Sequence, residues 1–349
     1  MAEYCISRIY PSDKKAFSKI DSLLRQEGIS RDANLDYTCA IYDDDMHFIA
    51  TGSCFKNTLR CMAVDHRHQG EGLLNQIVSH LIDYQYSRGI YHIFIYTKLS
   101  TEKFFRDLGF YEIARVDGKL VFMENRATGF SDYLDSLKGF RMEGNCSAIV
   151  MNANPFTLGH RYLIEQAAAA SDHVHLFIVS EDASLFPFEI RKRLVMEGVS
   201  DIKNVICHDS GPYIISNATF PSYFLRDSRD VIESHARLDI EIFARIASAC
   251  NISSRFVGEE PFSEVTGIYN RIMQEQLPAH GIACHIVPRK PMEGSDQPIS
   301  ASTVREAIRT GDVQLLKRLL PESTLSFLQS KEAAPLIQRI KAAASVVHY

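Results

Sequence analysis

The second half of the chain alternates apolar segments with amphipathic ones, and this alternation limits the available folds more than any other feature. Continuous apolar runs of strand length occur at 147–151, 174–179, 205–207, 255–257 and 284–287. Helical patterns separate them at 160–170, 188–198, 229–249, 264–276 and 303–309. Strands that are apolar on both faces and alternate with helices are typical of a parallel sheet covered on both sides. We therefore predict an α/β fold with a parallel sheet from residue 146 onward.

The first part of the chain mixes strands and helices differently. Apolar, β-branched runs at 4–9, 37–42, 47–55 and 59–64 predict strands, and helices are expected at 12–27 and 72–88. The polar, glycine-containing segment 127–145 is interpreted as a linker. The predicted organisation is a mixed α+β domain at 1–126, this linker, and an α/β domain at 146–349 that ends in a helical extension.

The charge of the chain argues against nucleic acid as a partner. Its 38 Lys and Arg residues against 43 Asp and Glu residues give a net charge of −5, whereas nucleic-acid binders present a basic face. No apolar stretch has the length of a membrane span, and the N-terminus shows no export signal. The eight cysteines include no C-x-x-C pair, so we predict no metal site and expect free thiols. A cytoplasmic protein without a membrane partner is expected.

The segment AIVMNANPFTLGHRYLI, at 148–164, joins the first strand of the second domain to its first helix. Such a turn presents backbone N–H groups and the positive helix end to an anion, as nucleotide phosphates require. Gly159 lets the backbone approach closely. His160, Thr157 and Asn154 offer donors for the charge that develops on an α-phosphate. Taken alone, an ordinary capped helix with an exposed histidine explains the turn equally well.

Two later segments favour the phosphate interpretation. The sequence PISASTVREAI, at 298–308, runs from a Ser/Thr cluster into a helix, with Arg305 placed to clamp β- and γ-phosphates through its planar fork. The strand at 255–257 ends in Gly258 and Glu259, which are positioned to receive a base or ribose. Arg191 and Arg193, on the expected helix at 188–198, either face phosphate or acetate or belong to a solvated helix face.

Thr157-x-Gly159-His160 followed by 299–305, ISASTVR, resembles the (H/T)xGH and ISSTxxR motif pair of the nucleotidyltransferase superfamily. Ala301 replaces the second serine of that pattern, Ser302 fills the threonine position and Arg305 stays in register. The resemblance implies a Rossmann-like domain that promotes attack on an α-phosphate and releases pyrophosphate. It implies catalytic roles for Thr157, His160 and Arg305. The ATP-binding residues it implies are Asn154, Pro155, Phe156, Gly159, Gly258, Glu259, Ser300, Ser302 and Thr303.

The similarity extends beyond these motifs. The segments NPFTLGHRYLIEQAA, SEDASLFPFEIRKRLV, YIISNATFPSYFL, RFVGEEPF and PISASTVR are similar to those of the citrate (pro-3S)-lyase ligase family, from residue 147 to about 309. This resemblance implies that ATP, with Mg²⁺, and acetate give acetyl-AMP and pyrophosphate. The acetyl group then passes to the prosthetic-group thiol of the citrate lyase acyl carrier protein. That group derives from dephospho-CoA.

A glycine motif lies at the start of the predicted helix 72–88. The segment VDHRHQGEGLL, at 64–74, would place N–H groups of Arg67, Gln69, Gly70 and Gly72 around a pyrophosphate. Together with KFFRDLGFYE, at 103–112, it resembles the GNAT superfamily of acetyltransferases over about 1–126. The resemblance implies binding of CoA or of a CoA-like prosthetic group. No residue stands out as a base for an acceptor amine, so ligand binding, a second activity and a purely structural domain all stay open.

Three functions of different kinds remain after this reasoning. The acyl-adenylating ligase accounts best for the segments of the second domain. A nucleotidyltransferase that acts on another small metabolite would use the same motif pair without acetate. An amine acetyltransferase with an ATP-binding module would turn over acetyl-CoA without ATP. ATP–pyrophosphate exchange with and without acetate separates them.

Overall fold

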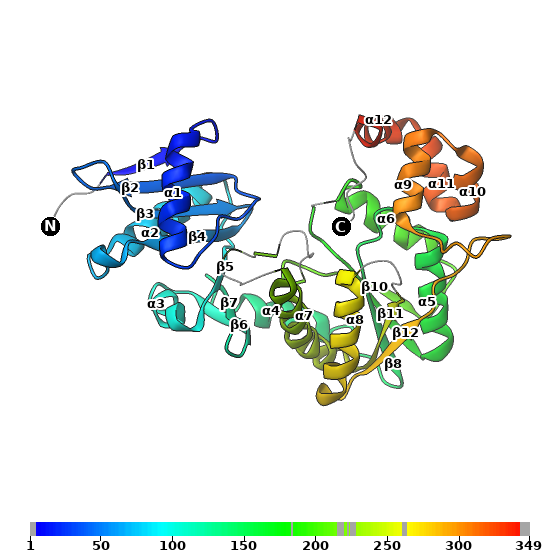
Figure 1. The fold of residues 1–349 in the computed structure, drawn as a ribbon. Helices are drawn as coiled ribbons and strands as arrows, with labels where there is room; N and C mark the ends of the chain where they lie inside the picture. Colours follow the sequence, from blue (N-terminus) through cyan, green and yellow to red (C-terminus); the bar gives the residue numbers. More distant parts are fainter. Residues whose placement is uncertain are drawn as a thin grey trace. The chain divides into compact units, whose positions relative to one another are not determined.

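The computed structural model describes residues 5–182, 184–214, 220–221, 223, 228–259 and 264–342. The chain forms two compact units (Figure 1). Unit 1 comprises Met1–Ser131 and Phe220–Leu238, and unit 2 comprises Asp132–Thr219 and Asp239–Tyr349. Unit 1 thus takes in a segment, Phe220–Leu238, that the predicted boundaries leave in the second domain. The expected linker contains helix α4 (Gly129–Lys138), whose Phe130 and Leu137 are buried.

Within the described residues, unit 1 is built on a seven-stranded mixed sheet of order β1-β2-β3-β4-β5-β7-β6. Its strands are β1 (Ile6–Ile9), β2 (Tyr37–Tyr42), β3 (Phe48–Phe55), β4 (Thr58–Val64), β5 (Phe94–Thr97), β6 (Tyr111–Val116) and β7 (Leu120–Glu124). Its helices include α1 (Lys14–Gln26), α2 (Leu73–Ser87) and α3 (Glu102–Asp107). Alternate residues of β2 serve opposite faces: Ala40 packs in the core cluster that contains α1 residues, and Cys39 in the one that contains α2 residues. The prediction of a mixed α+β domain is confirmed.

The parallel strands β4 and β5 diverge inside this sheet. In the described chain, their register covers only Thr58 with Phe94 and Leu59 with Ile95, whereas β4 stays paired with β3 as far as Val64. Tyr223, from the second segment of unit 1, donates from its hydroxyl to the carbonyl of Tyr96 at 2.7 Å. It packs with the apolar residues on the α1 side of the sheet. In the described residues, β4 is therefore not paired with β5 beyond Leu59, and Tyr223 packs in the same cluster as Cys61 and Ala63 of β4.

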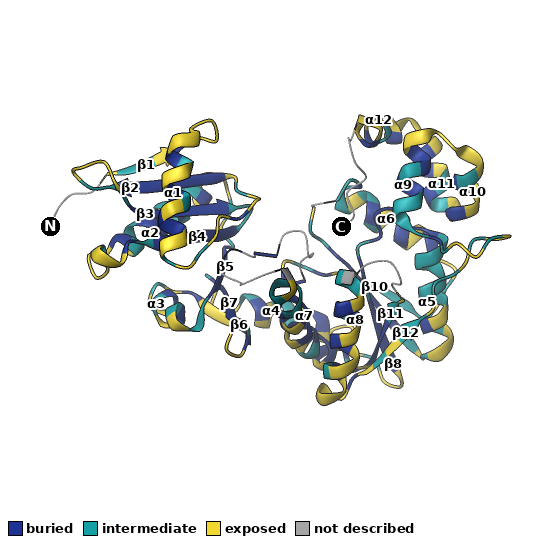
Figure 2. Cartoon of the chain, viewed as in Figure 1, coloured by how far each residue is buried: buried dark blue, intermediate teal, exposed yellow. Residues whose placement is uncertain are grey.

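Unit 2 is built on a five-stranded sheet of order β10-β9-β8-β11-β12 in the described residues. The strands are β8 (Cys146–Met151), β9 (His173–Ile178), β10 (Val205–Asp209), β11 (Ile252–Gly258) and β12 (Ala283–Val287), and every pair is parallel. The helices between them are α5 (Leu158–Ala170), α6 (Phe188–Gly198), α7 (Ser228–Cys250) and α8 (Glu264–Gln276). The three central strands β9, β8 and β11 are largely buried, whereas the edge strands β10 and β12 are mostly half-buried or exposed (Figure 2). The prediction of a parallel α/β domain is confirmed.

After β12 the chain continues in helices α9 (Ala301–Thr310), α10 (Val313–Leu319), α11 (Glu322–Gln329) and α12 (Ala334–Ala342). Leu316, Phe327, Leu336 and Ile340 from these helices belong to the same buried cluster as Ile149 of β8. The predicted C-terminal helical extension therefore packs on the core of unit 2. Residues 343–349, its predicted end, lie outside the described residues.

Candidate functional site

The strand order places a topological switch point between β8 and β11. The first strand of the unit, β8, lies between β9 and β11, so the connections leave it in opposite directions. Ligands of parallel α/β sheets bind in the crevice that such a point opens beyond the carboxyl ends of the strands. The turn with Thr157, Gly159 and His160 follows β8, and Glu259 follows β11. The chain therefore brings these sequence-predicted residues to the edge of the sheet where a nucleotide is expected.

Thr157 and His160 form a reciprocal cap at the start of α5. The side chain of Thr157 accepts a hydrogen bond from the backbone N–H of His160, with 3.3 Å between Oγ1 and N. In return, Nδ1 of His160 accepts from the backbone N–H of Thr157 at 3.1 Å. Since Nδ1 is an acceptor, the neutral ring carries its proton on Nε2. The cap thus selects the tautomer in which Nε2 is a donor.

The imidazole of His160 is held neutral at neutral pH. Burial lowers its pKa to about 4, and the nearby positive charges of Arg289 and Arg305 act in the same direction. Phe156, which is fully buried, stacks near the ring with 6.0 Å between ring centroids. A neutral Nε2–H group in this position can stabilise negative charge without a proton having to be gained first.

A second helix start lies directly beside the first. Ser300 caps α9, and its Oγ accepts from the backbone N–H of Thr303 at 3.0 Å. A Cβ atom added at Gly159 would lie 3.1 Å from the carbonyl oxygen of Ile299, which is closer than most Cβ contacts allow. Gly159 is therefore required for the close approach of the two turns, a role that adds to the one predicted from sequence.

Arg305 joins the two turns from within. Only 3% of this residue is exposed, and its Nη1 donates to the carbonyl of Asn154 at 2.7 Å. Its Nη2 lies 3.1 Å from Oγ of Ser302 and donates to it. Burial lowers the pKa of the guanidinium. The fork of Arg305 holds the β8–α5 turn against the start of α9.

The remaining predicted ATP ligands divide into two groups. Asn154 and Pro155 are buried in the β8–α5 turn, where Oδ1 of Asn154 accepts from the backbone N–H of Phe186 at 3.0 Å. Gly258 ends β11, with open space where a Cβ would stand, and Glu259 is exposed. The first group shapes the turn, and the second lies at the open rim of the sheet.

Sequence reasoning missed Arg289, which follows β12. Its Nε donates to the carbonyl of Glu259 at 2.8 Å, and its charge contributes to the lowered pKa of His160. A pair of basic residues directly after an apolar strand, at the same sheet edge as the histidine turn, was the available signal. Its relevance depends on β12 pairing with β11, which the sequence alone does not state.

The two interpretations of Arg191 from the sequence were both wrong. Arg191 is fully buried, and its guanidinium donates to the carbonyls of Asn152 at 2.8 Å, Val179 at 2.8 Å, Glu181 at 2.9 Å and Phe186 at 3.0 Å. It therefore neither faces a ligand nor lies on a solvated face. Its role is to hold the β8–α5 turn and the segment after β9 in one arrangement.

Arg191→Met is expected to lower the free energy of unfolding of unit 2 by about 3–5 kcal/mol, because buried carbonyls lose a charged donor. Urea unfolding measures this change. Arg193→Met is the matched control on the same helix, since Arg193 pairs with Glu332 on the surface and its loss should cost less than about 1 kcal/mol. Equal destabilisation by both substitutions would contradict the role assigned to Arg191.

The glycine loop of unit 1 has an open geometry. Gly70 and Gly72 adopt φ angles of 89° and 77°, and no atom lies within 4 Å of a Cβ added at either position. Gly72 is the N-cap of α2 and supplies no side-chain hydrogen bond to the helix start. Arg67 instead bonds to Asp65, with Nη2 2.7 Å from Oδ2, and this contact holds the pKa of Asp65 well below its usual range. Gln69, directly before Gly70, has an extended backbone.

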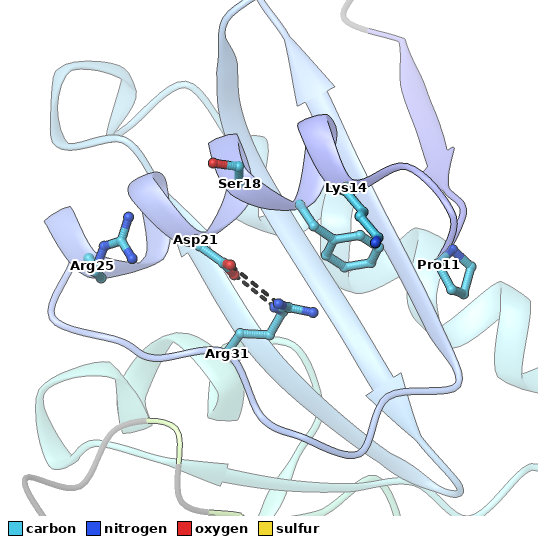
Figure 3. A pocket seen from close by; sticks show the side chains of 7 residues that line it. Pro11, Lys14, Ser18, Asp21, Arg25 and Arg31 are labelled. Atoms are coloured by element: carbon cyan, nitrogen blue, oxygen red, sulfur yellow. Dashed lines mark hydrogen bonds and ion pairs between the residues drawn. The ribbon is translucent and has the colours of Figure 1, made fainter.

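A surface depression beside α1 contains none of the predicted site residues. It is lined by Pro11, Lys14, Phe17, Ser18, Asp21, Arg25 and Arg31 (Figure 3). Arg31 is held there by Asp21, with 2.7 Å between Nε and Oδ1. We assign this depression no chemistry.

None of the helices in the described part of the chain is long and apolar enough to cross a membrane. The same residues contain no group of three or more His, Cys, Asp or Glu side chains arranged to hold a metal ion.

Several solved acetyltransferase structures resemble part of the chain. One is the ribosomal-protein-S18-alanine N-acetyltransferase from Escherichia coli, with 19% identity, 35% of this chain and 92% of that chain covered, and a TM-score of 0.28. Another is glucosamine-6-phosphate N-acetyltransferase from Arabidopsis thaliana, with 19% identity, 33% and 97% coverage, and a TM-score of 0.28. These TM-scores are too low to support an argument about the chain.

Comparisons of sequence are far more informative. Residues 146–328 match the family model of the citrate lyase ligase C-terminal domain. The chain is 40% identical to the citrate (pro-3S)-lyase ligase of Escherichia coli strain K12 over 329 residues, which cover 93% of each protein. It is 38% identical to the enzyme of the same name from Haemophilus influenzae, with 91% of this chain and 96% of that protein covered. The resemblance inferred from the motifs is confirmed, and the chain belongs to the citrate lyase ligase family.

Proposed function

We propose that this ligase activates citrate lyase by acetylating the prosthetic-group thiol of its acyl carrier protein, with acetate and ATP as the other substrates. The observation that supports this proposal most is that the N-terminal ends of α5 and α9 adjoin each other near the switch point. The neutral His160 lies in the first turn of α5. Two N-terminal helix ends and a fixed Nε2 donor suit an α-phosphate under attack. Membership of the citrate lyase ligase family supports citrate lyase as the protein that is acetylated.

The proposed reaction has two steps. A carboxylate oxygen of acetate attacks the α-phosphorus of ATP, the bond to the β-phosphate oxygen breaks, and acetyl-AMP and pyrophosphate form. The carrier thiolate then attacks the acetyl carbon, so that a C–S bond forms and AMP leaves. His160 stabilises the charge on the α-phosphate oxygens through Nε2–H, and Thr157 keeps the ring in that tautomer. Mg²⁺ is expected to enter with the phosphates of ATP.

Unit 1 is proposed to hold the prosthetic group of the carrier. The open, uncapped start of α2 at Gly70 and Gly72 fits a pyrophosphate, since its N–H groups have no side-chain acceptor from the cap. Residues 61–64 of β4, which lead to this loop, are not paired with β5, and a gap between the two strands at these residues is part of the proposal. Main-chain groups along such a gap can bond to an extended amide-containing arm, as in strand addition.

The test of the proposed function is isotope exchange between ATP and pyrophosphate, followed by acetylation of the carrier protein. Exchange that requires acetate, together with transfer of labelled acetate to the carrier, is the expected result. Exchange without acetate would instead favour nucleotidyl transfer to another metabolite. Turnover of acetyl-CoA without ATP would favour an amine acetyltransferase.

Arg305→Ala is expected to raise the KM for ATP and slow pyrophosphate formation by about 10- to 100-fold, since a charge-assisted contact is lost and the two turns separate. Arg305→Lys should recover only part of the activity, because Lys lacks the planar fork that reaches Asn154 and Ser302 together. Steady-state kinetics of exchange measure both. Full recovery with Lys would show that a positive charge alone is sufficient.

A further inference from the structure

The segment after β12 is folded back so that two cations stand beside the start of α9. Arg289 and Lys290 follow the strand, and the backbone N–H of Ile299 donates to the carbonyl of Lys290 at 3.0 Å. Pro291 and Pro298 form a bridge in the same hairpin. Ile299 directly precedes the cap residue Ser300, so the backbone of Lys290 is fixed next to the predicted phosphate turn.

The side chain of Arg289 crosses to the neighbouring strand. Its Nε donates to the carbonyl of Glu259, at the end of β11, at 2.8 Å. Its charge is also close enough to His160 to lower the pKa of that ring. Arg289 is only partly buried. The guanidinium of Arg289 therefore lies near both His160 and the carboxyl end of β11.

The side chain of Lys290 lies near the start of α5. Its Nζ lies 5.7 Å from the ring centroid of Tyr162, two residues after His160 on α5. This distance is within the range of a cation–π contact, which keeps an ammonium group in place without neutralising its charge. Lys290 too is partly exposed. Positive charge is thus held beside both helix starts.

The buried Arg305 is placed differently from these two. Its Nη atoms bond to Asn154 and Ser302 inside the protein, and the residue is 3% exposed. A nucleotide triphosphate gains negative charge on its departing β- and γ-phosphates as the α-phosphate is attacked. Arg289 and Lys290 are partly exposed, so their side chains can bind the phosphates on which this charge develops. The buried guanidinium of Arg305 instead fixes the position of the turn.

We propose that Arg289 and Lys290 are the residues that bind the β- and γ-phosphates of ATP and stabilise the departing pyrophosphate. The proposal rests on the proposed function only in taking ATP as the substrate. It assigns to this pair the clamp that the sequence alone suggested for Arg305, and it makes Arg305 chiefly the residue that positions the turns.

The test compares dissociation constants for Mg-ATP and AMP in the wild type, Arg289→Ala and Lys290→Ala. Each substitution should weaken Mg-ATP binding by about 10-fold and leave AMP within about twofold, because only the triphosphate reaches the pair. Arg309→Ala is the control. Arg309 is exposed, lies on α9 like Ser302, and pairs with Glu306. It should change neither constant.

A second readout does not use nucleotide at all. NMR titration of His160 should show its pKa rising in Arg289→Ala and staying in place in Arg309→Ala, because Arg289, unlike Arg309, contributes to the lowered pKa of this ring beside burial and Arg305. Unchanged Mg-ATP binding in both rim variants, or equal losses for Mg-ATP and AMP, would overturn the proposal. Absence of acetate-dependent exchange in the wild type would instead overturn the proposed function, while the comparison of Mg-ATP with AMP would still decide the role of the pair.

Discussion

His160→Ala is expected to reduce the rate of acetate-dependent ATP–pyrophosphate exchange by about 100-fold or more, while the fold and ATP binding are largely kept. The reason is the fixed tautomer: Nδ1 accepts from the backbone N–H of Thr157, so Nε2 is the donor that we propose stabilises the charge on the α-phosphate. This charge is greatest in the transition state, and the loss should therefore fall on kcat rather than on KM. Initial rates of exchange over a range of ATP concentrations measure the two parameters.

His160→Asn separates catalysis from helix capping. The Asn carbonyl can replace Nδ1 as the acceptor for the N–H of Thr157, but no group then occupies the position of Nε2. Both substitutions should therefore be equally inactive, although Asn should restore the thermal stability that Ala loses. Exchange within a few-fold of the wild type in either variant would contradict the assignment. Recovery in His160→Asn would identify the cap as the only role of the histidine.

The parallel sheet of unit 2 could be predicted because its signal is local. The strands at 147–151 and 174–179 are apolar except for Ser147 and His175, and burial on both faces of a sheet favours such a composition. The turn with Thr157 and His160 could be located for the same reason, since capping residues act within one turn of helix. What the sequence could not supply was which carbonyls would surround a given side chain.

Arg191 illustrates that limit. On a helical pattern an arginine is expected in solvent, and desolvation disfavours its charge. Its burial is possible because carbonyls from Asn152, Val179, Glu181 and Phe186 converge on one guanidinium, and residues that are distant in sequence meet only after β8 and β9 have paired. The contact of Arg289 with Glu259 depends in the same way on the pairing of β11 with β12.

The double substitution Gly70→Asp with Gly72→Asp is expected to lower the rate of carrier acetylation by about 10-fold or more and to leave acetate-dependent exchange intact. The two carboxylates would lie where the pyrophosphate of the prosthetic group is proposed to bind. Their negative charges would repel those of the pyrophosphate. Space for the new side chains exists, since no atom lies within 4 Å of either added Cβ. Carboxylates at a helix N-terminus are also favourable to the helix itself, so α2 should persist.

Backbone strain is the competing cause of any loss, because both glycines have positive φ. Gly89→Asp with Gly118→Asp controls for it: these glycines of unit 1 have φ angles of 75° and 69° and equally open surroundings. The control variant should acetylate the carrier at the rate of the wild type.

Free CoA should compete with the carrier in the wild type and in the control, and lose this effect in the Gly70/Gly72 variant. If the folded Gly70/Gly72 variant acetylated the carrier normally, the prosthetic group would have to reach acetyl-AMP without the α2 loop, and unit 1 would need another role.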